Sequence, residues 1–317
     1  MRKRCIDMVY ALAQRDERVV FIGSDLSPGL LGDMKKAYPE RYYMEGVAEA
    51  NIIGMAAGMA MEGLVPYVNT IATFITRRCY EQVALDLCLH DLPVRLIGNG
   101  GGYVYAPLGP THQAIEDLAI MRALPNMTVT AVCDAEEMTR LMNASLDWPH
   151  PIYIRLAKGG DPVVSRPEKG FAIGKAIEMS EHAGDAAGDV DALLVATGVA
   201  TTAALEASKN LAADGVRCRV LHVHTVKPLD TQAIVAAARA ARLVVTAEEH
   251  SIVGGLGSAV LEALADTGEP MPPVRRLGIR DEFAHNYGNQ QKLMDMWGIN
   301  ADGIAGAVSD GLARARQ

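Results

Sequence analysis

The chain has 317 residues, half of them hydrophobic and 21% charged, which is typical of a folded protein with room for two domains of ordinary size. Acidic residues exceed basic ones by eight (38 against 30) and no long lysine–arginine run occurs, so binding to nucleic acid or an anionic membrane is disfavoured. The five cysteines are scattered without a CxxC pair, and no membrane span or signal core is visible, which predicts reduced thiols in a cytoplasmic protein.

Strand and helix patterns alternate through the first half of the chain. The predicted strands are at 19–25, 42–44, 64–69, 92–98, 127–132 and 151–156, and the predicted helices are at 2–14, 47–61, 70–89 and 135–145. This alternation is typical of a parallel sheet with helices on both faces. Asp25 ends its strand at the sheet edge where ligands gather, although a turn aspartate that caps the next segment has the same pattern.

The predicted helix at 47–61 contains one ionisable residue, Glu49. Ala50, Gly54 and Gly58 recur every four residues along one face, which indicates the close approach of another backbone or a ligand. A buried carboxylate needs a partner or a chemical role, because desolvation of its charge is costly and raises its pKa. Glu49 is therefore either a satisfied core acid or a reactive group.

A glycine-rich loop at 99–102 leads toward a second candidate group, His112. Thr111 is placed to cap a new helix, which puts His112 at a helix N-terminus, where the helix dipole disfavours its cationic form. A neutral imidazole there can donate or accept a hydrogen bond. The alternative is a surface histidine in a first turn.

Charge, proline and glycine become frequent between Lys158 and Gly174, which predicts a first domain at 1–165, a linker at 166–190 and a second domain at 191–317. The second domain repeats the alternation, with strands at 192–198, 216–225 and 242–248 and helices at 203–213, 231–241 and after residue 257. The glycines at 254–257 do not match GxGxxG, because its third glycine falls on Val260. The predicted fold class is α/β, with two parallel-sheet domains.

Segment 43–58 resembles the catalytic-glutamate segment of transketolases and deoxyxylulose-phosphate synthases. The likeness continues, in the family's order, through segments 73–82, 109–113, 124–129, 196–198, 226–230 and 248–257. These segments correspond to the pyrimidine-binding domain and the C-terminal domain of a transketolase. The Gly-Asp-Gly motif followed by Asn, with which the family's diphosphate-binding domain holds magnesium and phosphates, is absent from the sequence.

The resemblance therefore implies the C-terminal subunit of a split transketolase that uses thiamine diphosphate. A separate N-terminal subunit would carry the diphosphate-binding domain and most of the contacts to Mg²⁺. The family further implies self-association through the pyrimidine-binding domain and a heterotetramer of two plus two subunits, with small sugars as substrates.

The resemblance also implies roles for individual residues. The glutamate that matches Glu49 hydrogen-bonds the aminopyrimidine ring and activates the cofactor, and the aromatic residue that matches Phe74 stacks on that ring. His112 matches a substrate-facing histidine with a catalytic role. The remaining positions that match the surroundings of the cofactor are Asp25, Leu26, Arg78 and Tyr80.

The substrate side departs from the family pattern. Leu108 replaces an aspartate that contacts a sugar hydroxyl, and Lys158 stands where the family often has a phosphate-binding arginine, so charge is kept without bidentate geometry. Gly29 replaces a phosphate-contacting serine, and the loop at 99–102 replaces a segment that often carries a histidine. We expect transfer of a two-carbon ketol unit from a ketose to an aldose, with an unusual sugar as substrate.

Three alternatives remain at the level of sequence. The β subunit of a 2-oxo-acid dehydrogenase shares the fold and the split arrangement, but segments 109–113 and 226–229 favour a transketolase. A deoxyxylulose-phosphate synthase is normally one long chain. A non-catalytic assembly subunit is disfavoured by the presence of Glu49 and Phe74 and favoured slightly by Leu108.

Overall fold

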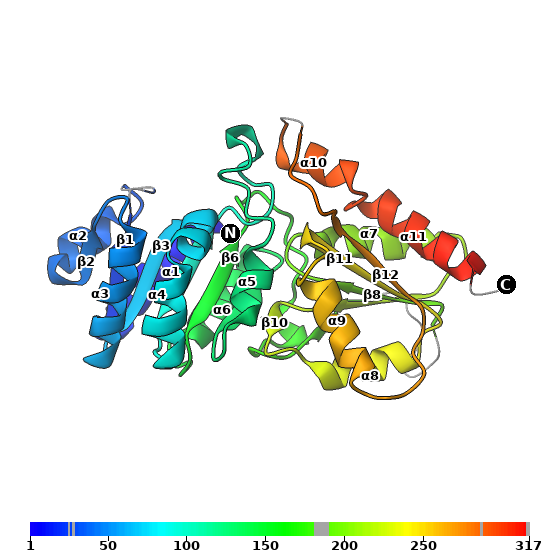
Figure 1. Cartoon of the computed structure of the whole chain (residues 1–317), viewed down its shortest axis with the longest axis horizontal. Helices are drawn as coiled ribbons and strands as arrows, with labels where there is room; N and C mark the ends of the chain where they lie inside the picture. Colours follow the sequence, from blue (N-terminus) through cyan, green and yellow to red (C-terminus); the bar gives the residue numbers. More distant parts are fainter. Residues whose placement is uncertain (25, 27–28, 181–189, 286–287, 315–317) are drawn as a thin grey trace.

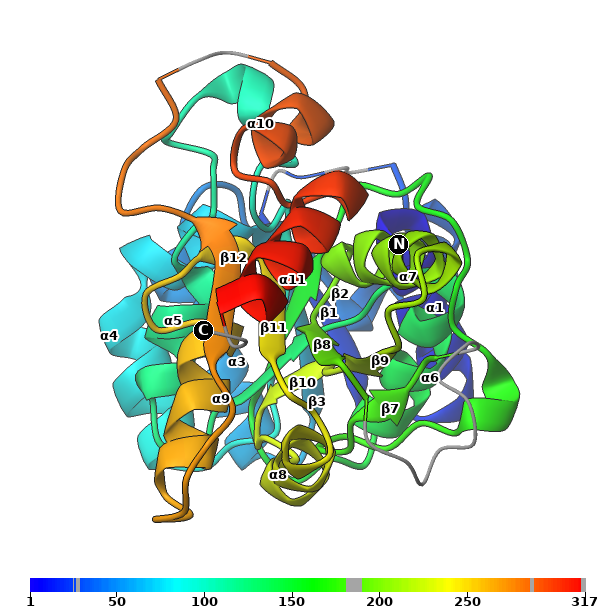
Figure 2. The ribbon, with the colours of Figure 1, turned by 90° about the vertical axis from the view of Figure 1, so that its right-hand side faces the viewer.

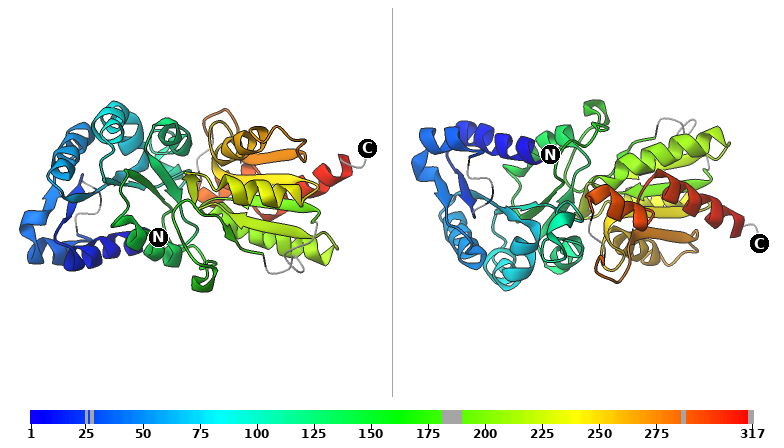
Figure 3. Two further views of the ribbon diagram at one scale, coloured as in Figure 1. Left: turned by 90° about the horizontal axis from the view of Figure 1, so that it is seen from below. Right: turned by 90° about the horizontal axis from the view of Figure 1, so that it is seen from above.

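The computed structural model describes residues 1–314 apart from residues 25, 27–28, 181–189 and 286–287. Two α/β halves lie next to each other along the long axis, and each consists of a sheet with helices on both faces (Figure 1, Figure 3). The predicted fold class is therefore confirmed. None of the helices in the described ranges is both long enough and apolar enough to cross a membrane.

The first sheet carries most of the candidate site residues. Its strands are β1 (Val19–Gly23), β2 (Tyr42–Met44), β3 (Val65–Ile71), β4 (Arg95–Asn99), β5 (Thr128–Ala131), β6 (Ile152–Leu156) and β10 (Thr225–Lys227). Their order is β10-β5-β6-β4-β3-β1-β2, and all described pairs are parallel except β10 with β5. The residues of β1, β4, β5 and β6 are buried along the whole length of each strand, as expected for a parallel sheet that is covered on both faces.

Helices cover both faces of the first sheet. They are α1 (Arg2–Arg15), α2 (Gly32–Ala37), α3 (Glu49–Met61), α4 (Tyr80–Gln82), α5 (Asp117–Ala123) and α6 (Ala135–Ser145), with short helical turns η1 (Pro39–Arg41), η2 (Phe74–Arg78), η3 (Val83–Leu89) and η4 (Ala106–Leu108). α1 and α6 pack on one face, and α3, η3 and α5 pack on the other. Adjacent residues of β1 point to opposite layers, Phe21 toward α1 and α6 and Ile22 toward α3.

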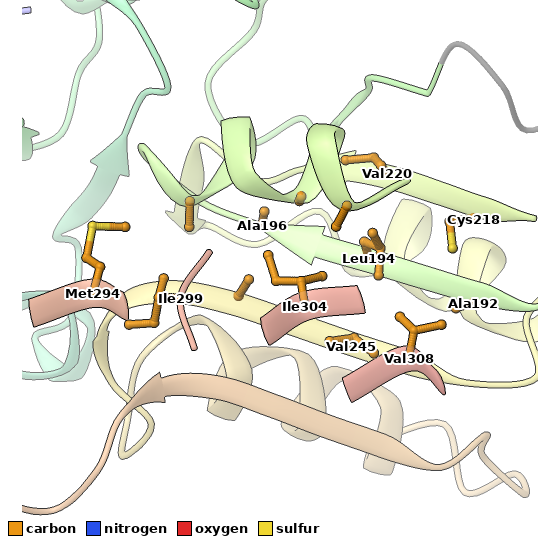
Figure 4. Packing of buried hydrophobic residues seen from close by; sticks show 14 of the residues in the cluster. Ala192, Leu194, Ala196, Cys218, Val220, Val245, Met294, Ile299, Ile304 and Val308 are labelled. Atoms are coloured by element: carbon orange, nitrogen blue, oxygen red, sulfur yellow. The ribbon is translucent and has the colours of Figure 1, made fainter. Parts of the chain in front are cut away.

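The second sheet has the same layered arrangement. Its strands are β7 (Ile177–Glu178), β8 (Ala192–Ala196), β9 (Cys218–His222), β11 (Val244–Ser251) and β12 (Val274–Ile279); its helices are α7 (Ala200–Ala213), α8 (Thr231–Arg239), α9 (Leu256–Ala265), α10 (Gln290–Met296) and α11 (Ala301–Arg314), with a turn η5 (Pro167–Lys169) before it. The order is β12-β11-β8-β9-β7, with β7 antiparallel to β9. α7 and α11 cover one face, and α8 and α9 the other (Figure 2). Leu194 and Ala196 of β8 face Ile304 and Val308 of α11 in the core (Figure 4).

Several sequence predictions differ from these bounds. The single strand predicted at 216–225 is wrong: β9 ends at His222 and β10 crosses to the first sheet, where the Ala131 N–H donates to the His224 carbonyl at 2.8 Å. Residues 225–227 pair with the open edge of β5, and no local sequence pattern predicts this pairing. β12, α10 and α11 were not predicted at all. The predicted domain limits stay a prediction; β7 falls inside the predicted linker.

A buried hydrogen bond between α6 and β9 joins the two halves. Glu137 Oε2 accepts hydrogen bonds from His222 Nε2 at 2.8 Å and from the Cys133 N–H at 2.7 Å, and both side chains of the pair are fully buried. Burial opposes ionisation of Glu137, but the facing His222 and the backbone N–H lower its pKa to about 2. His224 lies beside this pair and stacks on Phe171 with ring centroids 4.3 Å apart.

His224 gives a prediction for the pH dependence of stability. Burial lowers its pKa from 6.5 to about 4, so the folded protein binds this proton less tightly than the unfolded chain. The free energy of unfolding should therefore fall, by up to about 3 kcal/mol, as the pH drops from 6.5 to 4. Urea unfolding of wild type and His224→Phe at several pH values checks this. Phenylalanine keeps the stacking but does not titrate, so an equal pH dependence in both proteins contradicts the assignment.

Candidate active site

Glu49 is the first residue of α3, and its buried carboxylate lies near the carboxyl ends of β1 and β3. Only 2% of the residue is exposed. Its Oε1 accepts a hydrogen bond from Thr70 Oγ1 at 3.3 Å, and its Oε2 accepts one from Arg78 Nη1 at 3.0 Å. The Arg78 side chain is 43% exposed, so the ion pair reaches from the buried Glu49 carboxylate to the surface.

An aromatic and cationic row extends from this acid. The Arg78 guanidinium lies over the Phe74 ring, 4.3 Å from its centroid, and the His112 ring meets Phe74 edge-on at 5.2 Å. Phe74 and Arg78 begin and end the π-helical turn η2, a rare conformation that often marks functional sites. The structure thus brings together four residues proposed from the sequence, Glu49, Phe74, Arg78 and His112.

The surroundings of His112 differ from the sequence prediction. Thr111 caps no helix; α5 begins only at Asp117, and the Thr111 hydroxyl instead lies 2.9 Å from His112 Nδ1. The helix-dipole argument for His112 is therefore wrong. The buried Asp117 Oδ2 accepts a hydrogen bond from Arg155 Nε at 2.8 Å. Because α5 begins at Asp117, this contact holds the first residue of the helix in place. The half-buried His112 lies in the turn before it.

The other proposed residues lie around this row or apart from it. The hydroxyl of Tyr80 donates to the Ile120 carbonyl at 2.9 Å, so it binds α5 and not the acid. Leu26 is half-buried after β1, and Asp25 lies outside the described residues. Leu108 is 56% exposed at the end of η4, and Lys158 is exposed in the loop after β6.

Sequence reasoning missed the polar residues at the strand ends. Asn99 Nδ2 donates to Asn69 Oδ1 at 2.7 Å and to the Thr70 carbonyl at 2.9 Å, which ties the ends of β3 and β4 together next to Glu49. The buried Asn99 Oδ1 has no hydrogen-bond partner among the described residues. Asn69, Thr70 and Asn99 could have been proposed from the sequence, because they lie at the ends of apolar strands and ligands bind at this edge of parallel sheets.

The residues fit the pyrimidine end of thiamine diphosphate. The guanidinium of Arg78 is a flat, nitrogen-bearing donor that stacks on Phe74 and donates to Glu49. A heteroaromatic ring with N–H groups offers the same two complementary features, a flat face and a hydrogen-bond donor. In the described part of the chain, the one group of ligand atoms with metal-site spacing lies elsewhere, at Cys133, Glu137 and His222, within 4.8 Å of one another.

Two domain families match the chain. The transketolase pyrimidine-binding domain matches residues 1–160, and the transketolase C-terminal domain matches residues 185–304. The protein is thus built from two α/β domains of the transketolase type. The chain belongs to the transketolase family.

Relatives match the chain over almost its whole length. It is 36% identical to the 6-deoxy-6-sulfo-D-fructose transketolase subunit SqwH of Clostridium sp. (strain MSTE9), with 98% of this chain and 94% of that relative covered. It is 33% identical to one of the subunits of an apulose-4-phosphate transketolase of Phocaeicola vulgatus, with 96% and 94% covered. A solved structure of a split gene transketolase, an inactive beta4 tetramer, superimposes with a TM-score of 0.88 at 36% identity and 98% coverage of both chains.

One region of a longer relative matches almost the whole of this chain. The 1-deoxy-D-xylulose-5-phosphate synthase 1 of Geobacter sulfurreducens is 38% identical over 97% of this chain, which spans only 47% of that enzyme. The resemblance to the C-terminal subunit of a split transketolase is confirmed by these matches.

Proposed function

We propose that this chain is the C-terminal subunit of a two-component transketolase that transfers a two-carbon ketol unit from a ketose to an aldose. The observation that carries the proposal is the buried Glu49 carboxylate next to the Phe74 ring. The flat guanidinium of Arg78 already hydrogen-bonds this carboxylate and lies over this ring, as the pyrimidine of the cofactor would. Thiamine diphosphate, when bound, supplies the carbon nucleophile for this chemistry.

The residues of this chain supply positioning and proton transfer. Glu49 accepts and returns a proton at its carboxylate, which burial and the Thr70 hydrogen bond hold in one orientation. Phe74 supports the flat face of the pyrimidine ring, with the half-buried Leu26 as a second apolar contact. Asp25 and Tyr80 are cofactor-side residues in this proposal on the family resemblance alone. His112 lies at the edge of Phe74, where it can hydrogen-bond a substrate hydroxyl or carbonyl.

A partner subunit completes the enzyme in this proposal. It carries the diphosphate-binding domain and most of the contacts to Mg²⁺, in a heterotetramer of two plus two subunits. An exposed apolar surface supports self-association of this chain: Met61 of α3 and Leu85 and Leu89 of η3 are 56%, 49% and 71% exposed. The five free, buried cysteines suit a reducing, cytoplasmic environment.

The substrate is an unusual sugar in this proposal. The two relatives that are named as transketolase subunits act, by their names, on 6-deoxy-6-sulfo-D-fructose and on apulose 4-phosphate. In this chain the exposed Leu108 and Lys158 would contact the substrate, and a single flexible lysine charge suits a sulfonate or phosphate without demanding bidentate geometry.

The test is ketol transfer by the purified complex with its partner subunit. A donor ketose labelled with carbon-13 in its two ketol carbons is offered with a panel of aldoses, with and without thiamine diphosphate. Donors include 6-deoxy-6-sulfo-D-fructose, apulose 4-phosphate and ordinary pentose and hexose phosphates. We expect both labels to appear together in a new ketose, only with the cofactor. A 2-oxo acid is offered as donor in a parallel reaction, and release of carbon dioxide from it would favour synthase or dehydrogenase chemistry. A complex that binds no cofactor would favour a non-catalytic subunit.

A further inference from the structure

The glycine loop at 100–102 is pressed against two charged residues in the interface between the sheets. A Cβ on Gly101 would lie 2.3 Å from Nε of Arg155 in β6, and a Cβ on Gly102 would lie 2.4 Å from the carboxyl carbon of Glu249 in β11. Gly102 also has a φ of +62°, which favours glycine. The backbone of this loop can thus contact Arg155 and Glu249 closely only because these residues are glycines.

Glu249 holds this loop from the second sheet. The residue is 3% exposed. Its Oε1 accepts a hydrogen bond from the Tyr103 N–H at 2.7 Å, and its two oxygens accept from Gln290 Nε2 of α10 at 3.0 and 2.9 Å. Its backbone carbonyl accepts from Arg155 Nη2 at 2.8 Å. One buried residue thus connects the glycine loop, α10 and β6.

The hydrogen bond to Tyr103 lies at the base of a longer loop, residues 103–113. Gly102 and Ala114 close this loop by exchanging backbone hydrogen bonds of 2.8 and 3.1 Å. The Tyr103 hydroxyl accepts a hydrogen bond from Trp297 Nε1 at 2.9 Å, which fastens the same end to the second half. Leu108 and His112 are carried by this loop. Arg77 of η2 holds the loop near His112, since it donates to the Pro110 carbonyl at 3.3 Å and to the Gln113 carbonyl at 2.8 Å, and the base is the loop's second attachment. Where His112 lies relative to Phe74 therefore depends on both attachments.

We propose that Glu249 is a positioning residue for the loop at 103–113, which it holds through the Tyr103 N–H so that His112 stays at the edge of Phe74 and the loop keeps the shape that selects the sugar. The selection of sugar rests on the function proposed above; the holding of the loop does not. Glu249 acts through Tyr103 and touches none of the reacting atoms.

The protonation state of Glu249 affects how firmly the loop is held. Burial raises its pKa to about 7, although Arg155, the Tyr103 N–H and Gln290 act in the opposite direction; Asp117 of α5 raises it further. Glu248 and His250 flank it in β11, and His250 lies 4.0 Å from Asp117. The Glu249 carboxylate can accept all three hydrogen bonds, one from the Tyr103 N–H and two from Gln290 Nε2. A protonated carboxyl group has a hydrogen on one oxygen and therefore accepts fewer. The loop is thus held less firmly as the pH falls through about 7.

Hydrogen–deuterium exchange of the full chain tests the holding directly. In Glu249→Ala we expect peptides from residues 103–113 to exchange about tenfold faster, the effect of losing one buried hydrogen bond, with α3 and α6 unchanged. Glu249→Gln keeps an acceptor for Tyr103 and should stay near wild type, but without the loosening that wild type shows between pH 8 and pH 6 after correction for intrinsic exchange. Glu269→Gln, an exposed acid of the same half, is the matched control.

Unchanged protection of 103–113 in Glu249→Ala overturns the proposal, and so does equal acceleration in α3 and α6, which indicates general destabilisation. In the complex with the partner subunit, we expect Glu249→Ala to raise the KM for the aldose about tenfold while the Kd for thiamine diphosphate is kept. A loosened loop with unchanged KM removes the link to sugar selection. If the complex transfers no ketol unit at all, the proposed function fails while the exchange result still decides the role of Glu249.

Discussion

Replacement of Glu49 by glutamine is expected to lower the kcat of the assembled enzyme by about 10²- to 10⁴-fold, the usual contribution of a positioned acid–base group. Glutamine has nearly the same shape, and its single amide oxygen can still accept the hydrogen bond that Arg78 makes at 3.0 Å while its NH₂ group faces Thr70 Oγ1, but it cannot take up the proton. The rate of ketol transfer at saturating substrates and excess thiamine diphosphate is the measurement. Calorimetric binding of the cofactor to the variant separates lost chemistry from lost binding.

Glu45→Gln is the matched control for this experiment. Glu45 is an exposed acid four residues earlier in the chain, outside α3, and its variant should keep wild-type activity. If Glu49→Gln retains more than about a tenth of the wild-type rate, Glu49 is a satisfied core acid and not the activating group.

The largest expected effect on stability is that of Asp117→Asn, which should lower the free energy of unfolding by about 3–5 kcal/mol. Asp117 is fully buried and accepts hydrogen bonds from Arg155 Nε at 2.8 Å, from Arg155 Nη2 at 3.2 Å and from the Tyr153 hydroxyl at 2.7 Å. Asparagine leaves the Arg155 charge buried without its counter-charge. Urea unfolding of the isolated chain measures the loss.

Asp7→Asn provides the comparison with an exposed pair. Asp7 and Lys3 are 2.7 Å apart, but their side chains are 49% and 79% exposed, so water screens the pair and a change within about 0.5 kcal/mol is expected. A loss below about 1 kcal/mol for Asp117→Asn would mean that the Arg155 charge finds another partner or water, and that the buried pair does not hold the start of α5 in place.

The candidate site combines residues that the sequence proposed with contacts that it could not supply. Glu49 stood out as the single ionisable residue of an apolar helix, and the family resemblance added Phe74, Arg78 and His112. Which of them touch was not predictable, because Glu49 is 29 residues from Arg78 and their hydrogen bond forms only when α3 and η2 pack together. The same reason hid Asn99, whose partners Asn69 and Thr70 lie on the neighbouring strand.

The sequence by itself determined the α/β class, most strands of the first sheet and those helices whose ends have local signals. The helix predicted at 135–145 has the bounds of α6 because Asp134 caps it through the N–H groups of Glu136 and Glu137, a contact within three residues. Tertiary structure decided the crossing of β10 to the first sheet, the start of α5 at Asp117 and the hold of Glu249 on the loop that carries His112. In each of these cases a buried charge or an open strand edge takes its partner from a distant segment, and the energy of that contact outweighs the local preference.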